Sequence, residues 1–190
     1  MTENTDPIRG ERVIAAIAMP TADDSGDHAA EPAPLALGTR NGVIKRWNRE
    51  SPTTMDSWSI IDLKDDDEVL AAAEARDEDR LVFVSTDSSL LTFDAKNVRP
   101  QGRTAGGMAG IRLAEGCSVA AFAVIPANKV AWNYEEGDNG LFSASGAVVL
   151  TVAGDSEALP GTENGSAKVT PLEMYPTKGR GTGGVRSQRF

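Results

Sequence analysis

The stretch Val98-Arg-Pro-Gln-Gly-Arg-Thr-Ala-Gly-Gly-Met-Ala-Gly-Ile-Arg-Leu113 decides the fold, because the chain contains a second copy of it. The second copy is Tyr175-Pro-Thr-Lys-Gly-Arg-Gly-Thr-Gly-Gly-Val-Arg-Ser-Gln-Arg-Phe190. Alignment on Gly-Arg-x-x-Gly-Gly sets Arg103 against Arg180 and Met108 against Val185. Each copy is a glycine-rich loop that becomes a strand. Such a loop, with a flanking arginine and free amides, suits a phosphate. The alternative is a tight loop that needs glycine for its geometry alone.

The composition allows one sizeable core or several small repeated units, because the chain has 190 residues. Its 28 acidic and 19 basic residues give a formal charge of −9, which argues against a simple basic nucleic-acid binder. Acidic residues concentrate between Asp62 and Asp79. From Gly165 to Phe190 there are instead five basic residues and one acidic residue. The basic groups therefore concentrate where the glycine loops are.

The single cysteine, Cys117, allows no disulfide framework or cysteine metal cluster within one chain, which fits a cytosolic protein. No apolar run approaches the roughly 20 residues of a membrane helix, and residues 1–7 lack the features of a signal peptide. We therefore expect a cytoplasmic protein without a membrane partner. The single histidine, His28, lies in a polar loop and is expected to be solvated.

A second repeat lies in two hairpin-like segments. Leu35–Trp47 contains the strong turn signal Asn41-Gly42 between two apolar runs, and Leu81–Phe93 has the same form. Alignment of Thr39 with Thr86 sets the expected offset between the two segments. Residues 63–69 likewise resemble residues 113–119, and a third cycle opens at residue 147. Residues 69–76 have helix propensity, but the repeat predicts a strand there.

Four short strands recurring at roughly 45 to 50 residues indicate a bladed, all-β repeat. We expect a frayed tail at residues 1–10 and a folded unit over residues 11–190. Within that unit we expect a blade-closing strand at 11–19 and blades at 35–76, 81–125 and 147–190.

These motifs resemble the C-terminal DNA-wrapping domain of the A subunit of bacterial type IIA topoisomerases, DNA gyrase and topoisomerase IV. The resemblance covers roughly residues 10–190. It rests on both glycine-loop stretches and on Gly38-Thr-Arg-Asn-Gly-Val-Ile-Lys-Arg46. The last glycine loop, with Gly161-Thr-Glu-Asn-Gly-Ser-Ala-Lys-Val-Thr-Pro171 before it, is similar to actinobacterial members.

The resemblance implies an incomplete β-pinwheel, which is a propeller-like array of about three four-stranded blades. In such an array the blades exchange strands, and a basic rim bends DNA. The partners that it implies are duplex DNA, the ATPase B subunit, and the catalytic core of the A subunit. Magnesium and ATP are implied only for that parent enzyme, and no cofactor is expected in this segment. The location would be the nucleoid in the cytoplasm.

One departure from the family concerns the gyrase box Gln-Arg-Arg-Gly-Gly-Lys-Gly, on which negative supercoiling depends. The nearest stretches here, residues 101–107 and 178–184, are degenerate versions of it. Decatenation or relaxation is therefore expected of the parent enzyme rather than supercoiling.

Backbone binding to DNA requires lysine and arginine along the rim. The candidate DNA-binding residues are Arg40, Lys45, Arg46, Arg99, Arg103, Arg112, Lys168, Lys178, Arg180, Arg186 and Arg189. The alternative is that they only solvate the surface. No base-reading element is evident, so binding is expected to follow the backbone and its deformability.

Two further classes of function compete with a DNA-bending module. A bladed protein-interaction scaffold would suit the acidic balance. A hydrolase has the least support, because there is no G-x-S-x-G motif and no metal-ligand spacing. The acidic run of residues 65–68 is expected to be a solvated turn rather than a metal site. Trp47, Trp58 and Trp132 are expected to pack in the blades.

Overall fold

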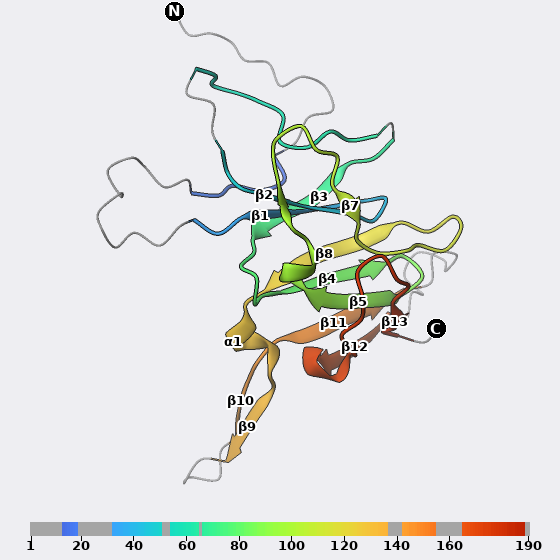
Figure 1. The fold of residues 1–190 in the computed structure, drawn as a ribbon. Helices are drawn as coiled ribbons and strands as arrows, with labels where there is room; N and C mark the ends of the chain where they lie inside the picture. Colours follow the sequence, from blue (N-terminus) through green and yellow to red (C-terminus); the bar gives the residue numbers. More distant parts are fainter. Residues whose placement is uncertain are drawn as a thin grey trace, which may run out of the picture.

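The computed structural model describes residues 13–18, 32–50, 54–64, 66–136, 142–154 and 165–188. Over these residues the regular structure is nearly all strand, which confirms the all-β prediction (Figure 1). The helices are α1 and the 3-10 turns η2 and η3, with bounds Ala127–Val130, Ala95–Asn97 and Leu172–Met174. No helix in the described ranges is long and apolar enough to cross a membrane.

Blade 1 is built on the first hairpin, whose turn residue Gly42 has a φ of +82°. Its strands are β1 (Leu35–Thr39), β2 (Val43–Trp47), β3 (Val69–Glu74), β6 (Pro100–Gln101) and β7 (Met108–Ala109). They pair in the order β3-β1-β2-β6, and β7 also pairs with β2. Residues 69–74 thus form the strand that the repeat predicts, in spite of their helix propensity.

Blade 2 repeats this arrangement. Its strands are β4 (Arg80–Ser85), β5 (Ser89–Asp94), β8 (Val119–Ile125) and β13 (Val185–Arg186), and they pair in the order β8-β4-β5-β13. Both blades therefore have the same layout. The hairpin lies in the middle of the sheet, and a short strand pairs with the second strand of the hairpin.

The short edge strand of each blade comes from the chain segment that follows the hairpin of the next blade. Met108 of β7 pairs with Ile44 of blade 1, and Val185 of β13 pairs with Leu90 of blade 2. Met108 and Val185 are the two residues that the alignment of the glycine motifs sets against each other. The repeat of the glycine motifs therefore corresponds to equivalent exchanged strands.

In the structure, the residue of the second hairpin that corresponds to Thr39 lies one position before Thr86. In the pairing between each central strand and its outer neighbour, a register shift occurs at Thr39 in blade 1 and at Ser85 in blade 2. The Thr39 hydroxyl accepts a hydrogen bond from the Val43 amide at 3.0 Å, and the Ser85 hydroxyl accepts one from the Ser89 amide at 3.2 Å. Ser85, not Thr86, is therefore the equivalent of Thr39.

Blade 3 contains β11 (Val148–Ala153) and β12 (Ser166–Pro171), and within the described ranges these strands pair only with each other. Two strands of blade 3 are thus described where four were expected, and β13, from the same stretch, pairs with blade 2 instead. The hairpin of β9 (Asn133–Glu136) and β10 (Phe142–Ser145) separates blades 2 and 3 and projects from the stack (Figure 1).

Residues 13–18, which belong to the strand expected at 11–19, form no strand. Ile17 instead packs against an apolar cluster on the outer face of blade 1, together with Trp58 and Ile60. The remaining residues of that expected strand, the tail at 1–10 and His28 lie outside the described residues.

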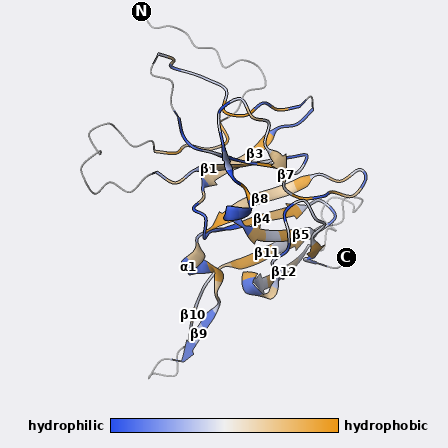
Figure 2. Cartoon of the chain, in the orientation of Figure 1, coloured by the Kyte–Doolittle hydropathy of each residue, from blue (hydrophilic) through white to orange (hydrophobic). Residues whose placement is uncertain are grey.

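The core lies between blades rather than within any one of them. Between blades 1 and 2, Ile44 packs with the aromatic rings of blade 2, where the ring centroids of Phe83 and Phe122 are 4.8 Å apart. Between blades 2 and 3, Val82 and Leu90 pack with blade 3 residues that include the buried Tyr175. Figure 2 shows the hydrophobic strands of blade 2 at the centre of the stack and the hydrophilic β9 at its end.

Candidate nucleic-acid interface

The two glycine motifs form loop 1 (residues 102–107) and loop 2 (residues 179–184), and each crosses the hairpin of the preceding blade. A Cβ atom on Gly107 would lie 2.8 Å from the carbonyl oxygen of Ile44, and one on Gly184 would lie 2.6 Å from that of Leu90. Gly107 also has a φ of +82°. Close backbone approach therefore explains these glycines without a ligand.

The two loops also meet each other. The Gly181 amide donates to the Gly110 carbonyl at 2.6 Å, and the Gly110 amide donates to the Gly42 carbonyl at 2.8 Å. The Arg112 amide donates to the Thr182 carbonyl at 3.0 Å. Turns belonging to all three blades thus form one continuous edge of the molecule, and these amides are used within the fold rather than offered to a phosphate.

Lys45 was a candidate DNA-binding residue, and the structure contradicts that role because its side chain is fully buried. Its amine donates to the carbonyl oxygens of Ile60, Arg103 and Ala105 at 2.8, 2.9 and 2.6 Å. Burial lowers the pKa of the Lys45 amine, and the carboxylate of Asp62 opposes part of that lowering. Lys45 therefore fastens loop 1 to the segment that covers blade 1.

Replacing Lys45 with methionine is expected to lower the free energy of unfolding by about 1–3 kcal/mol, because carbonyls of loop 1 lose their donor. Urea denaturation followed by tryptophan fluorescence would measure this, since Trp47 and Trp58 lie in the same cluster. An exposed lysine, Lys64, provides the matched control, and Lys64→Met is expected to change stability by less than about 0.5 kcal/mol. Equal effects of the two substitutions would contradict the fastening role.

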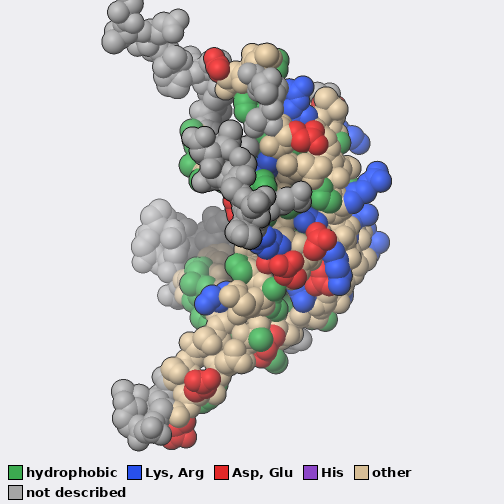
Figure 3. All heavy atoms as spheres, turned by 60° about the vertical axis from the view of Figure 1, so that its left-hand side comes forward, with side chains coloured by type: hydrophobic (Ala, Val, Ile, Leu, Met, Phe, Trp, Pro, Cys, Tyr) green, Lys and Arg blue, Asp and Glu red, His purple; other side chains and the backbone are tan. Residues whose placement is uncertain are grey.

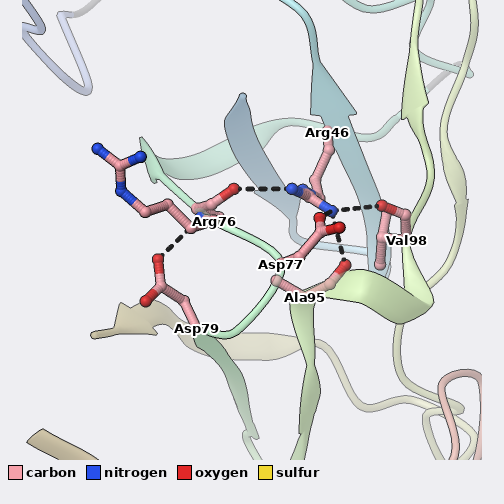
Figure 4. A network of polar contacts seen from close by, with 7 residues as sticks. Arg46, Arg76, Asp77, Asp79, Ala95 and Val98 are labelled. Atoms are coloured by element: carbon pink, nitrogen blue, oxygen red, sulfur yellow. Dashed lines mark hydrogen bonds and ion pairs between the residues drawn. The ribbon is translucent and has the colours of Figure 1, made fainter. Parts of the chain in front are cut away.

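Arg46 is the second candidate that the structure contradicts, because only 1% of its surface is exposed. Figure 4 shows its guanidinium enclosed by backbone carbonyls of both blades. It donates to Ala75 at 2.9 Å, Ala95 at 3.0 Å and Val98 at 3.1 Å, and it lies 2.7 Å from the Asp77 carboxylate. Arg46 therefore joins blade 1 to blade 2 and cannot reach a phosphate.

Arg40 is exposed, but its guanidinium donates to the Glu68 carboxylate at 2.6 Å. Next to it, the Asp67 carboxylate accepts the Asn41 amide at 2.9 Å. The acidic run of residues 65–68 was expected to be a solvated turn. Its described residues instead form hydrogen bonds with the first hairpin turn. Asp65 lies outside the described residues.

Three candidates, Arg99, Arg112 and Arg186, are exposed, and their guanidinium groups have no hydrogen-bond or ion-pair partner among the described residues. Four others contact the fold, three by donating to backbone carbonyls and Arg103 through its own carbonyl and a 3.9 Å contact of its guanidinium with the Met55 sulfur. These are Arg180, which donates to Ala109 at 2.7 Å, Lys168, which donates to Ser187 at 2.9 Å, Lys178, which is 3.5 Å from the Gly184 oxygen, and Arg103, whose own carbonyl accepts from Lys45. Arg189 lies outside the described residues.

The structure brings several of these candidates together. Arg112 and Arg180 meet where loops 1 and 2 touch, and Nη2 of Arg112 is 3.8 Å from the position of a Cβ atom on Gly183. Lys168 and Arg186 line one open hollow. Figure 3 shows lysine and arginine side chains along the right-hand edge of the molecule, with carboxylates between some of them.

Sequence reasoning missed Lys96, which lies next in the chain to Asn97, a residue that contacts Arg180 of loop 2. Its side chain is mostly exposed, 3.4 Å from Asp94, and the neighbouring Asn97 carbonyl accepts a hydrogen bond from Arg180 at 3.3 Å. Its position just before the first glycine-loop stretch was the available signal.

A family model described as the DNA gyrase C-terminal domain, beta-propeller, matches residues 79–126 and 161–190 of this chain. The DNA gyrase A subunit of Staphylococcus aureus strain MRSA252 is 29% identical over 155 residues, which cover 80% of this chain and 15% of that protein. The same values hold for its counterpart from strain NCTC 8325. The chain thus spans about 15% of the length of these curated relatives.

Two solved structures share the fold. The crystal structure of the C-terminal domain of DNA topoisomerase IV has a TM-score of 0.60 at 21% identity. The match covers 84% of this chain and 42% of the topoisomerase IV chain. The E. coli ParC C-terminal domain has a TM-score of 0.50 at 16% identity. This match covers 80% of this chain and 52% of the ParC chain. The chain is thus similar in sequence to the DNA gyrase C-terminal domain, beta-propeller, and it shares its fold with the C-terminal domains of DNA topoisomerase IV and ParC.

Proposed function

We propose that this chain is a non-catalytic module that binds and bends duplex DNA along the edge formed by loops 1 and 2. The observation that carries the proposal is the packing of the two loops, which gathers Arg112 and Arg180 at one junction. Arginine pairs with phosphate through charge-assisted hydrogen bonds, so a row of such groups follows a DNA backbone.

Arg99, Arg112 and Arg186 are the phosphate-binding candidates of first rank, because their guanidinium groups are exposed and unpaired among the described residues. Lys178 and Arg180 can contribute only part of their donors, since carbonyls of the fold already accept from them. The buried Lys45 and Arg46 contribute none. Neutralised phosphates release counterions, so the affinity for DNA is expected to fall steeply with salt.

Within a complete A subunit, this module would present duplex DNA to the catalytic core for strand passage, and a further partner would be the ATPase B subunit. The degenerate forms of the gyrase box at residues 101–107 and 178–184 favour decatenation or relaxation over negative supercoiling. Magnesium and ATP would act in those other parts of the enzyme.

The test is binding of a fluorescent duplex of about 100 base pairs, shorter than the persistence length of DNA, at several salt concentrations. Arg112→Ala/Arg186→Ala removes two exposed charges of the edge without disturbing a described side-chain hydrogen bond. The slope of log K against log salt is expected to become shallower by about 0.9 for each phosphate that is no longer neutralised, or about 1.8 for this variant.

The matched control is Arg76→Ala/Lys129→Ala, which removes the same charge from exposed side chains elsewhere. Figure 4 shows the Arg76 side chain pointing away from the network around Arg46. The control is expected to retain the wild-type slope. Equal losses in both variants would refute the edge, and an absence of wild-type binding at low salt would favour a protein-interaction scaffold instead.

A further inference from the structure

The guanidinium of Arg103 in loop 1 rests on a sulfur atom. Its Nη1 atom lies 3.9 Å from the sulfur of Met55, and the guanidinium has no other hydrogen-bond or ion-pair partner among the described residues. The equivalent guanidinium in loop 2, that of Arg180, instead donates to the carbonyl oxygens of Asn97 and Ala109 at 3.3 and 2.7 Å. A thioether is a weak acceptor, so Arg103 is held more loosely than Arg180.

Met55 belongs to the segment that covers the outer face of blade 1, and its side chain is open to solvent. Trp58 and Ile60 anchor that segment in the apolar cluster of blade 1, whereas Met55 is 51% exposed. The segment lies outside the residues that the family model matches, so the family match does not account for its contact with loop 1. A small oxidant in solution can reach the Met55 sulfur.

The surroundings of Arg103 leave its guanidinium room to move. Arg103 lines an open hollow together with Ser59, Asp62 and Thr104. The charge of the Asp62 carboxylate acts on the Lys45 amine, and in the described part of the chain it forms no ion pair with Arg103. The contact with Met55 is therefore the one that fixes where this guanidinium lies.

Oxidation of Met55 changes the strength of that contact. A lone pair of the sulfur attacks one oxygen of hydrogen peroxide, and the O–O bond breaks. The second oxygen leaves as hydroxide and takes up the proton of the first, which gives water. The sulfur loses two electrons, the peroxide gains them, and the product is methionine sulfoxide. The polar oxygen of the sulfoxide accepts a charge-assisted hydrogen bond from a guanidinium, which the thioether does only weakly.

We propose that Met55 is a redox-sensitive modification site that controls whether Arg103 can bind a phosphate. With the thioether, the guanidinium can turn from the sulfur to a DNA backbone at loop 1. With the sulfoxide, it pairs with the new oxygen and is withdrawn from DNA. This role rests on the proposed binding of DNA, whereas the link between Met55 and Arg103 forms without DNA.

The test compares DNA binding before and after treatment with hydrogen peroxide, in a Cys117→Ser background that removes the only thiol. Peptide mass spectrometry establishes that Met55 is oxidised. The slope of log K against log salt is expected to become shallower by about 0.9, the value for one phosphate that is no longer neutralised. Enzymatic reduction of the sulfoxide should restore the slope. Met55→Gln, whose amide oxygen is a strong acceptor, should show the shallower slope without peroxide.

Two variants establish which methionine is responsible. Met55→Leu keeps an apolar side chain that cannot form a sulfoxide, so peroxide should leave its DNA binding unchanged. Met174→Leu is the matched control, because Met174 is 70% exposed and has no arginine partner among the described residues. It should respond to peroxide like the wild type. A Met55→Leu variant that stays sensitive to peroxide, or a wild type whose slope does not change, overturns the proposal.

A second measurement separates this link from the proposed function. Magnetic resonance of the isotope-labelled chain follows the guanidinium protons of Arg103 without DNA, and Arg103→Lys assigns their signals. Oxidation is expected to slow the exchange of these protons with water in the wild type and not in Met55→Leu. Unchanged exchange refutes the link even where DNA binds. If exchange slows but the wild type binds no DNA at low salt, the link stands, and the proposed function falls together with the control of DNA binding.

Discussion

Arg46→Met is expected to lower the free energy of unfolding by about 3–5 kcal/mol, the largest loss that we expect from a single substitution in this chain. Methionine fills a similar volume but cannot donate to the carbonyls of Ala75, Ala95 and Val98. Each buried acceptor that loses its donor costs about 1–3 kcal/mol. The Asp77 carboxylate contributes little to the loss, because 72% of its side chain is exposed and water can solvate it.

Urea denaturation monitored by circular dichroism would measure this effect. Arg76→Met is the control, because Arg76 is exposed and its guanidinium has no partner among the described residues. It should shift the free energy of unfolding by less than about 0.5 kcal/mol. Because Arg46 joins two blades, its loss allows blade 1 to unfold at a lower urea concentration than blade 2. In that case the unfolding transition of the variant is broader than that of the wild type. A loss below about 1 kcal/mol would show that the carbonyls find other donors.

The repeats in the sequence predicted more of the fold than its local propensities did. Residues 69–74 are alanine-rich and favour a helix, but their place in the repeat correctly predicted a strand. The repeat of the glycine loops likewise located β7 and β13 before any pairing was known. A repeat carries tertiary information, because equivalent segments must bury equivalent faces.

The burial of Lys45 and Arg46 could not be predicted in the same way. Alternation along a strand normally places one face in water, so a Lys-Arg pair suggests that at least one side chain is exposed. In β2 both faces are covered, one by blade 2 and the other by the segment containing Trp58 and Ile60. That segment matches no repeat, so the sequence contained no sign of where it packs.

The candidate site was predicted as a group of basic residues, and the structure divides that group by burial. The equivalent of Arg46 in blade 2 is Thr92, which is also buried. Because Thr92 is polar, the alignment of Thr39 with Ser85 gives no sign in the sequence that Arg46 is buried.

Gly107→Ala is expected to lower the free energy of unfolding by about 2–4 kcal/mol, from a positive φ and an overpacked contact together. The φ of +82° disfavours any side chain, and the new Cβ atom would lie 2.7 Å from Val43 and 2.8 Å from the Ile44 carbonyl. Because loop 1 crosses the hairpin of blade 1 at this point, the loop must lift away or the hairpin must shift. Thermal or urea denaturation of the purified variant measures the loss.

Gly102→Ala is the control within the same loop, because no atom lies within 4 Å of a Cβ at that position. It should be neutral to within about 0.5 kcal/mol. The pair also separates two roles of the glycines. If both variants are equally stable and only Gly107→Ala weakens DNA binding, Gly107 serves a ligand. If Gly107→Ala is destabilised and the fraction still folded binds DNA like the wild type, Gly107 serves the crossing of the hairpin, and DNA binding is left to the basic side chains along the edge.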